Sequence, residues 1–221
     1  KCLRLKLPRL KALNKVRDNS SLSQSSLEDN KKPFVAFNAD YLKLSDEEVL
    51  SGGTFASENR TIFICFDPAP YNLSSFDNQT LMHFDTTDAF ASASNGRLEI
   101  GGDDSFSDAS FVTDAKIYID GVGYNAYSRI YNRPNIVTIS KVDSTKSLKL
   151  RHNGSQIASL TNFSDNWLSE YLKIGGNSKN LGIKYYDMFG FDSVLSDSDI
   201  KAYEKYLFET YFNTAGFYFA K

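Results

Sequence analysis

Short apolar-alternating runs separated by turn-forming residues recur along most of this chain, and they limit its fold more than any other feature. The clearest case is the segment 148–157, where Asn153-Gly154 stands between two such runs. An Asn-Gly pair in this setting favours a two-residue turn in which both central residues have positive φ. We therefore expect a β-hairpin in which Leu150 faces Ile157, within a larger β-meander.

Similar strand-like runs are spread over the whole sequence, with Ser, Asn, Asp and Gly clusters between them. This spacing is typical of a β-sandwich. A chain of 221 residues with 41% hydrophobic and 14% aromatic residues is long enough for one large sandwich, and no second domain is needed. The expected strands are Phe34 to Phe37, Tyr41 to Leu44, Thr61 to Phe66, Gln79 to Phe84, Arg97 to Ile100, Ala115 to Ile119, Asn135 to Lys141, Leu148 to Arg151, Gln156 to Leu160, Tyr171 to Ile174 and Tyr185 to Phe191.

One helix is expected near the C-terminus. Ser196 followed by Asp199 resembles a capping box with Asp in place of Glu, and it predicts a helix that runs to about residue 211. Ile200, Tyr203 and Leu207, together with Tyr211, then share one face. That face should pack on the sandwich.

The order of these segments resembles a known family. A short strand closed by Gly175-Gly176, a strand at 185–191 and the capped helix are similar to the C-terminal half of a laminin-G-like domain. The segments 13–20 and 32–42 are similar to the opening of laminin-G-like modules of phage and bacterial surface proteins. These modules belong to the concanavalin A-like lectin and glucanase superfamily. The resemblance implies an all-β fold, a two-sheet antiparallel jelly-roll sandwich with one C-terminal α-helix, over residues 13–211.

The two ends of the chain differ from this body. The seven basic residues among positions 1–17 meet no acid before Asp18, so 18 of the 25 basic residues remain to face all 27 acidic ones. We expect a basic N-terminal arm at 1–12. Either it docks on an acidic neighbour or, as the less expected partner, on nucleic acid, or it forms a first strand through Leu3, Leu5 and Leu7 with its charges solvated. Residues 212–221 form an apolar aromatic tail, expected as a closing strand or a contact with another subunit.

Several functional classes lack their sequence signals. Cys2 and Cys65 provide neither a disulfide framework nor a four-ligand zinc site, and Cys65 is expected to be a buried thiol. The apolar runs are far shorter than a membrane span, and no phosphate-binding or dinucleotide motif occurs. Nucleic acid is not an expected partner.

Catalysis is not expected either. The glucanases of the superfamily use a Glu-x-Asp-x-x-Glu type of run, which this chain does not contain. The two histidines, His83 and His152, have no recognisable nucleophile motif beside them, and we interpret both as packed or solvated residues.

Two loops are candidate binding sites. Asp103, Asp104 and Asp108 place carboxylates together, and calcium favours oxygen ligands of this kind. Laminin-G-like domains often hold calcium at a rim loop, so calcium is an optional ligand here, and no cofactor is required. Sugar recognition in such folds combines an aromatic platform with amide partners. The candidate residues for it are Tyr124, Asn125, Tyr127, Tyr131 and Trp167.

The sequence therefore predicts a non-enzymatic carbohydrate-binding or adhesion module on an extracellular surface or virion, with glycans as partners. The first alternative is a structural or decoration protein whose partners are neighbouring subunits of an assembly. The second is a polysaccharide-degrading enzyme. The predicted fold does not distinguish these three functions, because β-sandwiches host many unrelated activities.

Overall fold

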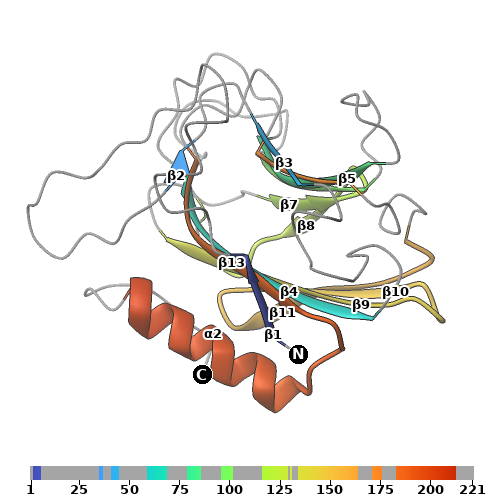
Figure 1. Ribbon diagram of the computed structural model, residues 1–221. Coiled ribbons are helices and arrows are strands. Elements are labelled where there is room, and N and C mark those ends of the chain that lie inside the picture. Colours follow the sequence, from blue (N-terminus) through green and yellow to red (C-terminus); the bar gives the residue numbers. More distant parts are fainter. Residues whose placement is uncertain are drawn as a thin grey trace, which may run out of the picture.

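The computed structural model describes residues 2–5, 35–36, 41–44, 59–68, 79–85, 96–101, 116–128, 130, 134–163, 171–175 and 183–212. Within these ranges the chain forms two antiparallel sheets and one helix (Figure 1). The prediction of a two-sheet jelly-roll sandwich with a C-terminal helix is confirmed.

The first sheet, here called sheet I, has seven strands and lies in the lower half of Figure 1. Its hydrogen-bonded order is β1-β13-β4-β9-β10-β11, and β2 also pairs with β13. The strands are β1 (Cys2–Leu5), β2 (Val35–Ala36), β4 (Arg60–Pro68), β9 (Asn135–Val142), β10 (Ser147–His152), β11 (Ser155–Thr161) and β13 (Ile183–Phe191).

The second sheet, sheet II, has six strands in the order β3-β12-β5-β6-β7-β8 and is stacked above sheet I in Figure 1. Its strands are β3 (Tyr41–Leu44), β5 (Gln79–Asp85), β6 (Arg97–Gly101), β7 (Lys116–Ile119), β8 (Val122–Asn125) and β12 (Tyr171–Gly175).

The main core lies between the two sheets. Because side chains alternate along a strand, Ile62, Ile64 and Phe66 of β4 face the same cluster as Leu98 and Ile100 of β6, and all are at most 1% exposed. A buried tyrosine connects the layers as well, since the Tyr185 hydroxyl of β13 donates to the Leu81 carbonyl of β5 at 3.0 Å.

The helix α2 (Asp197–Tyr211) covers the other face of sheet I, below it in Figure 1. The Ser196 hydroxyl caps the helix by accepting from the Asp199 amide at 3.2 Å, and the hydroxyl donates to the Asp199 carboxylate at 2.7 Å. Ile200 and Leu207 are buried against a second apolar cluster. The predicted cap, extent and packing face are confirmed.

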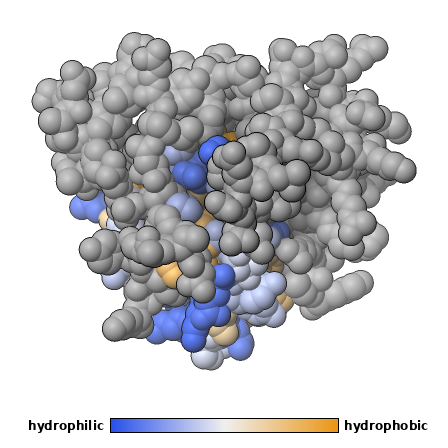
Figure 2. Space-filling view, turned by 90° about the vertical axis from the view of Figure 1, so that its left-hand side faces the viewer, coloured by the Kyte–Doolittle hydropathy of each residue, from blue (hydrophilic) through white to orange (hydrophobic). Residues whose placement is uncertain are grey.

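Aromatic rings dominate this second cluster. The Phe63 and Phe189 rings stack with centroids 4.9 Å apart, and Phe191 lies beside both. Cys65 is fully buried in the same cluster, as predicted. The exposed face of α2 is polar, and in Figure 2 the described surface at the lower end of the molecule, where α2 lies, is mainly hydrophilic.

The Asn153-Gly154 turn is confirmed, with φ values of 46° and 88°, and β9, β10 and β11 form the expected meander. The predicted facing of Leu150 and Ile157 is wrong. A bulge at Ile157 shifts the register so that Leu150 faces Ala158. The Asn-Gly motif does not predict the extra residue in β11, because a turn determines only the residue pairs directly next to it.

The N-terminal segment contributes a strand, since Cys2–Leu5 pairs with β13 at one edge of sheet I. Of the two alternatives given for the N-terminal arm, this agrees with a first strand, which the alternation of Leu3 and Leu5 with basic residues indicated. The tail beyond residue 212 lies outside the described residues. No helix among the described residues has the length and apolar character that crossing a membrane requires.

Candidate functional site

The candidate sugar-binding residues begin in β8 (Val122–Asn125), a strand that was not predicted from the sequence. β8 is the outermost strand of sheet II, and it pairs with β7 through a two-residue turn, Asp120-Gly121, in which both residues have positive φ. The Asp120 carboxylate also accepts from the Gly96 amide at 2.6 Å, so the tip of the hairpin is attached to the start of β6. The edge position of β8 leaves most of its residues exposed.

The strand divides the predicted sugar-binding residues between its two faces. Tyr124 packs against the core and is partly buried, and burial, followed by the negative charge of Asp120, raises the pKa of its hydroxyl. Asn125 is exposed and lies on the opposite face, because neighbouring residues of a strand point in opposite directions. Tyr127, in the loop that follows, is 46% exposed. Asn125 and Tyr127 are thus accessible, whereas Tyr124 supports the edge of the sandwich.

A buried histidine holds the backbone of this loop. The Tyr127 amide donates to His152 Nδ1 at 3.1 Å, so Nδ1 is an acceptor and the ring proton resides on Nε2. Nε2 in turn donates to the Asn135 side-chain oxygen at 2.8 Å, and the Asn135 amide donates to the Ile130 carbonyl at 2.8 Å. Burial lowers the pKa of His152 to about 3, so the ring is neutral and this tautomer persists at ordinary pH.

The turn residue Asn153 provides a second attachment. Its side-chain oxygen accepts from the Ile136 amide, and its side-chain nitrogen donates to the Ser128 hydroxyl, each at 2.8 Å. Asn153 is 5% exposed. The loop that presents Tyr127 is therefore attached at Tyr127, Ser128 and Ile130 to the ends of β9 and β10.

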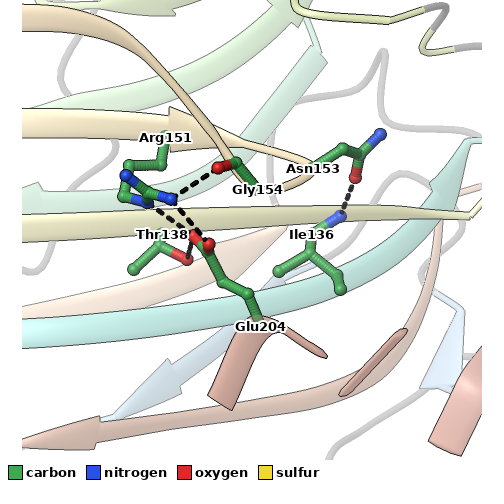
Figure 3. Close-up of polar contacts among 6 residues, drawn as sticks. All are labelled: Ile136, Thr138, Arg151, Asn153, Gly154 and Glu204. Atoms are coloured by element: carbon green, nitrogen blue, oxygen red, sulfur yellow. Dashed lines mark hydrogen bonds and ion pairs between the residues drawn. The ribbon is translucent and has the colours of Figure 1, made fainter. Parts of the chain in front are cut away.

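An ion pair between α2 and sheet I supports the turn end of the β10–β11 hairpin (Figure 3). The Arg151 guanidinium binds both carboxylate oxygens of Glu204, at 2.9 and 3.0 Å, and also donates to the Gly154 carbonyl. The Thr138 hydroxyl donates to the same carboxylate at 2.8 Å. Glu204 is fully buried, and its contacts with Arg151 and Thr138 join α2 to sheet I, whereas the Arg151 bond to Gly154 lies within the β10–β11 hairpin. The Asn153-Gly154 turn is thus attached on one side to α2 through Arg151 and on the other to the loop through the Asn153 side chain.

The outer face of the β7–β8 hairpin, on the far side of sheet II from the core, presents a second group of side chains. The register pairs Lys116 with Asn125 and Tyr118 with Gly123. A Cβ atom at Gly123 would lie 2.7 Å from a Tyr118 ring carbon and 3.0 Å from Lys116 Cδ. Both side chains therefore extend across the glycine, which only a residue without a side chain permits.

Further along this face, charged residues are buried. Arg97 and Glu99 of β6 are 6% and 5% exposed and lie 3.6 Å apart, and the Thr80 hydroxyl donates to Glu99 at 3.4 Å. His83 is buried opposite Arg97. Of the two interpretations given for the histidines, packed or solvated, the structure shows packing for both, and His152 also has a positioning role that was not expected.

The remaining predicted site residues lie outside the described part of the chain. They are Tyr131, Trp167, Asp103, Asp104 and Asp108. Among the residues that are described, no group of three or more His, Cys, Asp or Glu side chains could hold a metal ion. Calcium at the three aspartates stays a prediction.

The signals for the missed residues were present but ambiguous. Asp120-Gly121 between Ile119 and Val122 is a hairpin turn motif, and it would have placed Lys116 and Tyr118 opposite Asn125 and Gly123. The roles of His152 and Asn153 had no such signal, because their partners, which include the backbone amides of Ile136 and Tyr127, lie 17 to 25 residues away in the sequence.

No family model matches the chain, and no curated protein matches it by sequence. Its fold is similar to the receptor-binding domain of botulinum neurotoxin D, with a TM-score of 0.54 and 16% identity over 86% of this chain and 46% of that one. The same toxin domain has been solved with N-acetylneuraminic acid, and there the match has a TM-score of 0.53, 16% identity and 85% and 44% coverage. This chain thus spans less than half of those toxin domains.

A further match covers nearly all of a smaller protein. The CBM40 of Ruminococcus gnavus IT-sialidase, bound to α2,3-sialyllactose, matches with a TM-score of 0.52 and 17% identity over 79% of this chain and 97% of that one. Identities this low demonstrate a shared fold only. The chain has a two-sheet β-sandwich fold, which it shares with these proteins.

Proposed function

We propose that this chain is a non-catalytic glycan-binding domain of the laminin-G-like type, displayed on an extracellular surface or virion. The observation that supports it best is the end of β8 and the loop after it, where the exposed Asn125 amide and the exposed Tyr127 stand on a backbone fixed by partly buried hydrogen bonds. Aromatic faces and amides are the groups that bind sugar rings and hydroxyls. A fixed loop loses little conformational entropy when it binds a ligand.

The sialic-acid ligands in the structures of two similarly folded proteins support the same class of ligand. We therefore expect the chain to bind glycans through Asn125 and Tyr127. The predicted Tyr131 and Trp167 are the next candidates for contacts. Calcium at Asp103, Asp104 and Asp108 belongs to the same proposal, as an ion that orders a rim loop.

A glycan array with the purified chain, run with calcium and with a chelator, tests the proposal. Binding to a defined set of glycans is expected. The decisive variant is Tyr127→Ala, which should weaken binding at least about tenfold, since truncating a tyrosine that is a central contact of a binding interface costs about 2 kcal/mol. Tyr206→Ala is the matched control, because Tyr206 is an equally exposed tyrosine, at 53%, on α2.

Absence of glycan binding with and without calcium would refute the lectin proposal. Equal losses in the Tyr127 and Tyr206 variants would refute this location of the site. Turnover of a polysaccharide would refute the non-catalytic part.

A further inference from the structure

We propose that Glu204 of α2 is a positioning residue for the loop that carries Tyr127, because it fixes the hairpin turn to which that loop is attached. The glycan as the ligand of the loop rests on the proposed function, whereas the attachment itself does not. Glu204 bonds to Arg151 and Thr138 of sheet I. Its influence on the loop therefore passes through the end of β10 and the turn after it, residues 151–154.

The helix side holds the first and last residues of this segment (Figure 3). Arg151 Nε and Nη2 donate to the two carboxylate oxygens of Glu204 at 2.9 and 3.0 Å, and a two-point contact of this kind fixes the orientation of the guanidinium. Nη2 also donates to the Gly154 carbonyl. Arg151 is 6% exposed and Glu204 is fully buried, so water has little access to these bonds. The carboxylate of α2 thus directs the guanidinium at the turn.

The two residues in between hold the loop. The Tyr127 amide donates to His152 Nδ1 at 3.1 Å, and the Asn153 side-chain nitrogen donates to the Ser128 hydroxyl at 2.8 Å. His152 and Asn153 are both buried. Because neighbouring residues of a strand point to opposite faces, Arg151 reaches α2 on one side of sheet I while His152 reaches the loop on the other. One short piece of backbone therefore connects the helix to the loop.

A loop attached in this way depends on the segment that holds it. A binding group keeps its place only when its supporting residues are themselves fixed. Without the Glu204 carboxylate, the Arg151 guanidinium is buried without its anion and loses the group that directs it at the Gly154 carbonyl. The turn is then less restrained, and the loop spends part of the time away from its binding conformation. The apparent affinity for a ligand falls in proportion to the time that the loop remains in place.

Hydrogen exchange of single amides, followed by NMR on the full chain, measures the attachment without any ligand. The Tyr127 amide donates directly to His152, and it should exchange at least about fivefold faster in Glu204→Ala, the effect of weakening one hydrogen bond. Leu207→Ala is the matched control, because it removes a buried side chain from the same helix and keeps the ion pair. It should accelerate exchange of the Ile64 amide in β4, between β13 and β9, and leave the Tyr127 rate unchanged.

A double variant distinguishes positioning from a purely structural role. Arg151→Met with Glu204→Leu leaves no charge buried without a partner, but it also leaves the Gly154 carbonyl without the guanidinium. It should be more stable than Glu204→Ala and still show fast exchange at Tyr127. Slow exchange that returns together with stability would overturn the inference, and so would equal acceleration of Tyr127 in Glu204→Ala and Leu207→Ala.

Isothermal titration with 3′-sialyllactose then links the attachment to binding. Glu204→Ala and the double variant should bind about twofold to tenfold more weakly than the wild type, and Leu207→Ala should bind equally well at a temperature where all four proteins are folded. Faster exchange at Tyr127 with unchanged affinity would overturn the role of Glu204 in binding and leave the glycan-binding proposal intact. A wild type that binds no glycan on the array would refute that proposal, whereas the exchange comparison would still decide whether Glu204 holds the loop.

Discussion

At the scale of single residues, Glu204 shows how a tertiary contact alters the meaning of a sequence position. Its helix has an apolar stripe at Ile200, Tyr203 and Leu207, and an acid beside that stripe would ordinarily be solvated. Here the carboxylate is fully buried and accepts bonds from Arg151 and Thr138 (Figure 3). A buried carboxylate is tolerated only when paired in this way.

We predict that Glu204→Ala lowers the free energy of unfolding by about 3 to 5 kcal/mol, because it leaves the Arg151 guanidinium buried without its anion. Urea unfolding monitored by circular dichroism measures this loss. The control is Glu209→Ala, which removes the partner of Lys205 in an exposed pair 3.8 Å apart and should cost less than about 1 kcal/mol.

The double variant Arg151→Met with Glu204→Leu distinguishes a missing partner from missing packing. It should be less destabilised than Glu204→Ala, because no charge is left buried without a partner. A double variant that is less stable than the single one would contradict this explanation of the ion pair.

At the scale of elements, two type I′-like hairpin turns position the candidate site. Asp120-Gly121 connects β7 to β8, and Asn153-Gly154 connects β10 to β11, with positive φ at all four residues. Such turns match the right-handed twist of the strands. Asn153 differs from a simple turn residue, because its side chain also bonds to Ile136 and Ser128.

Asn153→Gly separates these two roles, since glycine adopts the turn conformation but has no side chain. We expect a loss of about 1 to 3 kcal/mol, because the buried Ile136 amide loses its acceptor. Hydrogen exchange of the amides at 126–128 should become faster. Asn162→Gly is the control, since Asn162 is exposed and also has a positive φ, of 62°. Unchanged exchange in Asn153→Gly would mean that the side chain does not hold the loop.

At the scale of the whole molecule, the two outer faces of the sandwich have different environments. The outer face of sheet I is covered by α2 (Figure 1) and is aromatic. The outer face of sheet II bears polar and charged side chains, of which those of β6 are buried and Asn125 of β8 is exposed. The loop from β8 to β9 connects the edge of sheet II to sheet I, and His152 holds it there. Global stability should therefore depend on the protonation of this histidine.

The pKa of His152 is about 3 in the folded protein, compared with 6.5 for an imidazole that is not buried, as in the unfolded chain. Between these two pH values the unfolded chain therefore binds a proton that the folded chain does not. The free energy of unfolding should fall as the pH drops from 6.5 towards 3, by up to about 1.4 kcal/mol per pH unit. His152→Gln does not titrate. Its stability deficit relative to the wild type, measured by urea unfolding, should shrink between pH 7 and pH 4.

The wild type and His152→Gln contain the same carboxylates, so the effect of carboxylate titration on stability largely cancels in the difference between them. A deficit that stays constant over this pH range would show that His152 is not neutral in the fold, or that it titrates normally.

The sequence by itself determined the elements whose signals are local. The Asn153-Gly154 turn, the Ser196 cap with Asp199, and the strand at Thr61 to Phe66 each depend on residues within one turn or one strand, and the structure has them all. The spacing of short strand-like runs between turn-forming clusters also predicted the sandwich.

Only the tertiary structure decided which polar residues were structural and which were available for binding. Tyr124 and Asn125 are neighbours in the sequence, yet one packs on the core and the other is exposed, because β8 is an edge strand. Lys116 and Tyr118 meet Gly123 and Asn125 only through cross-strand pairing. Bulges, such as the one at Ile157, change the register by one residue. Contacts between strands depend on register and burial, and these follow from packing over the whole chain, whereas turns and caps follow from a few adjacent residues.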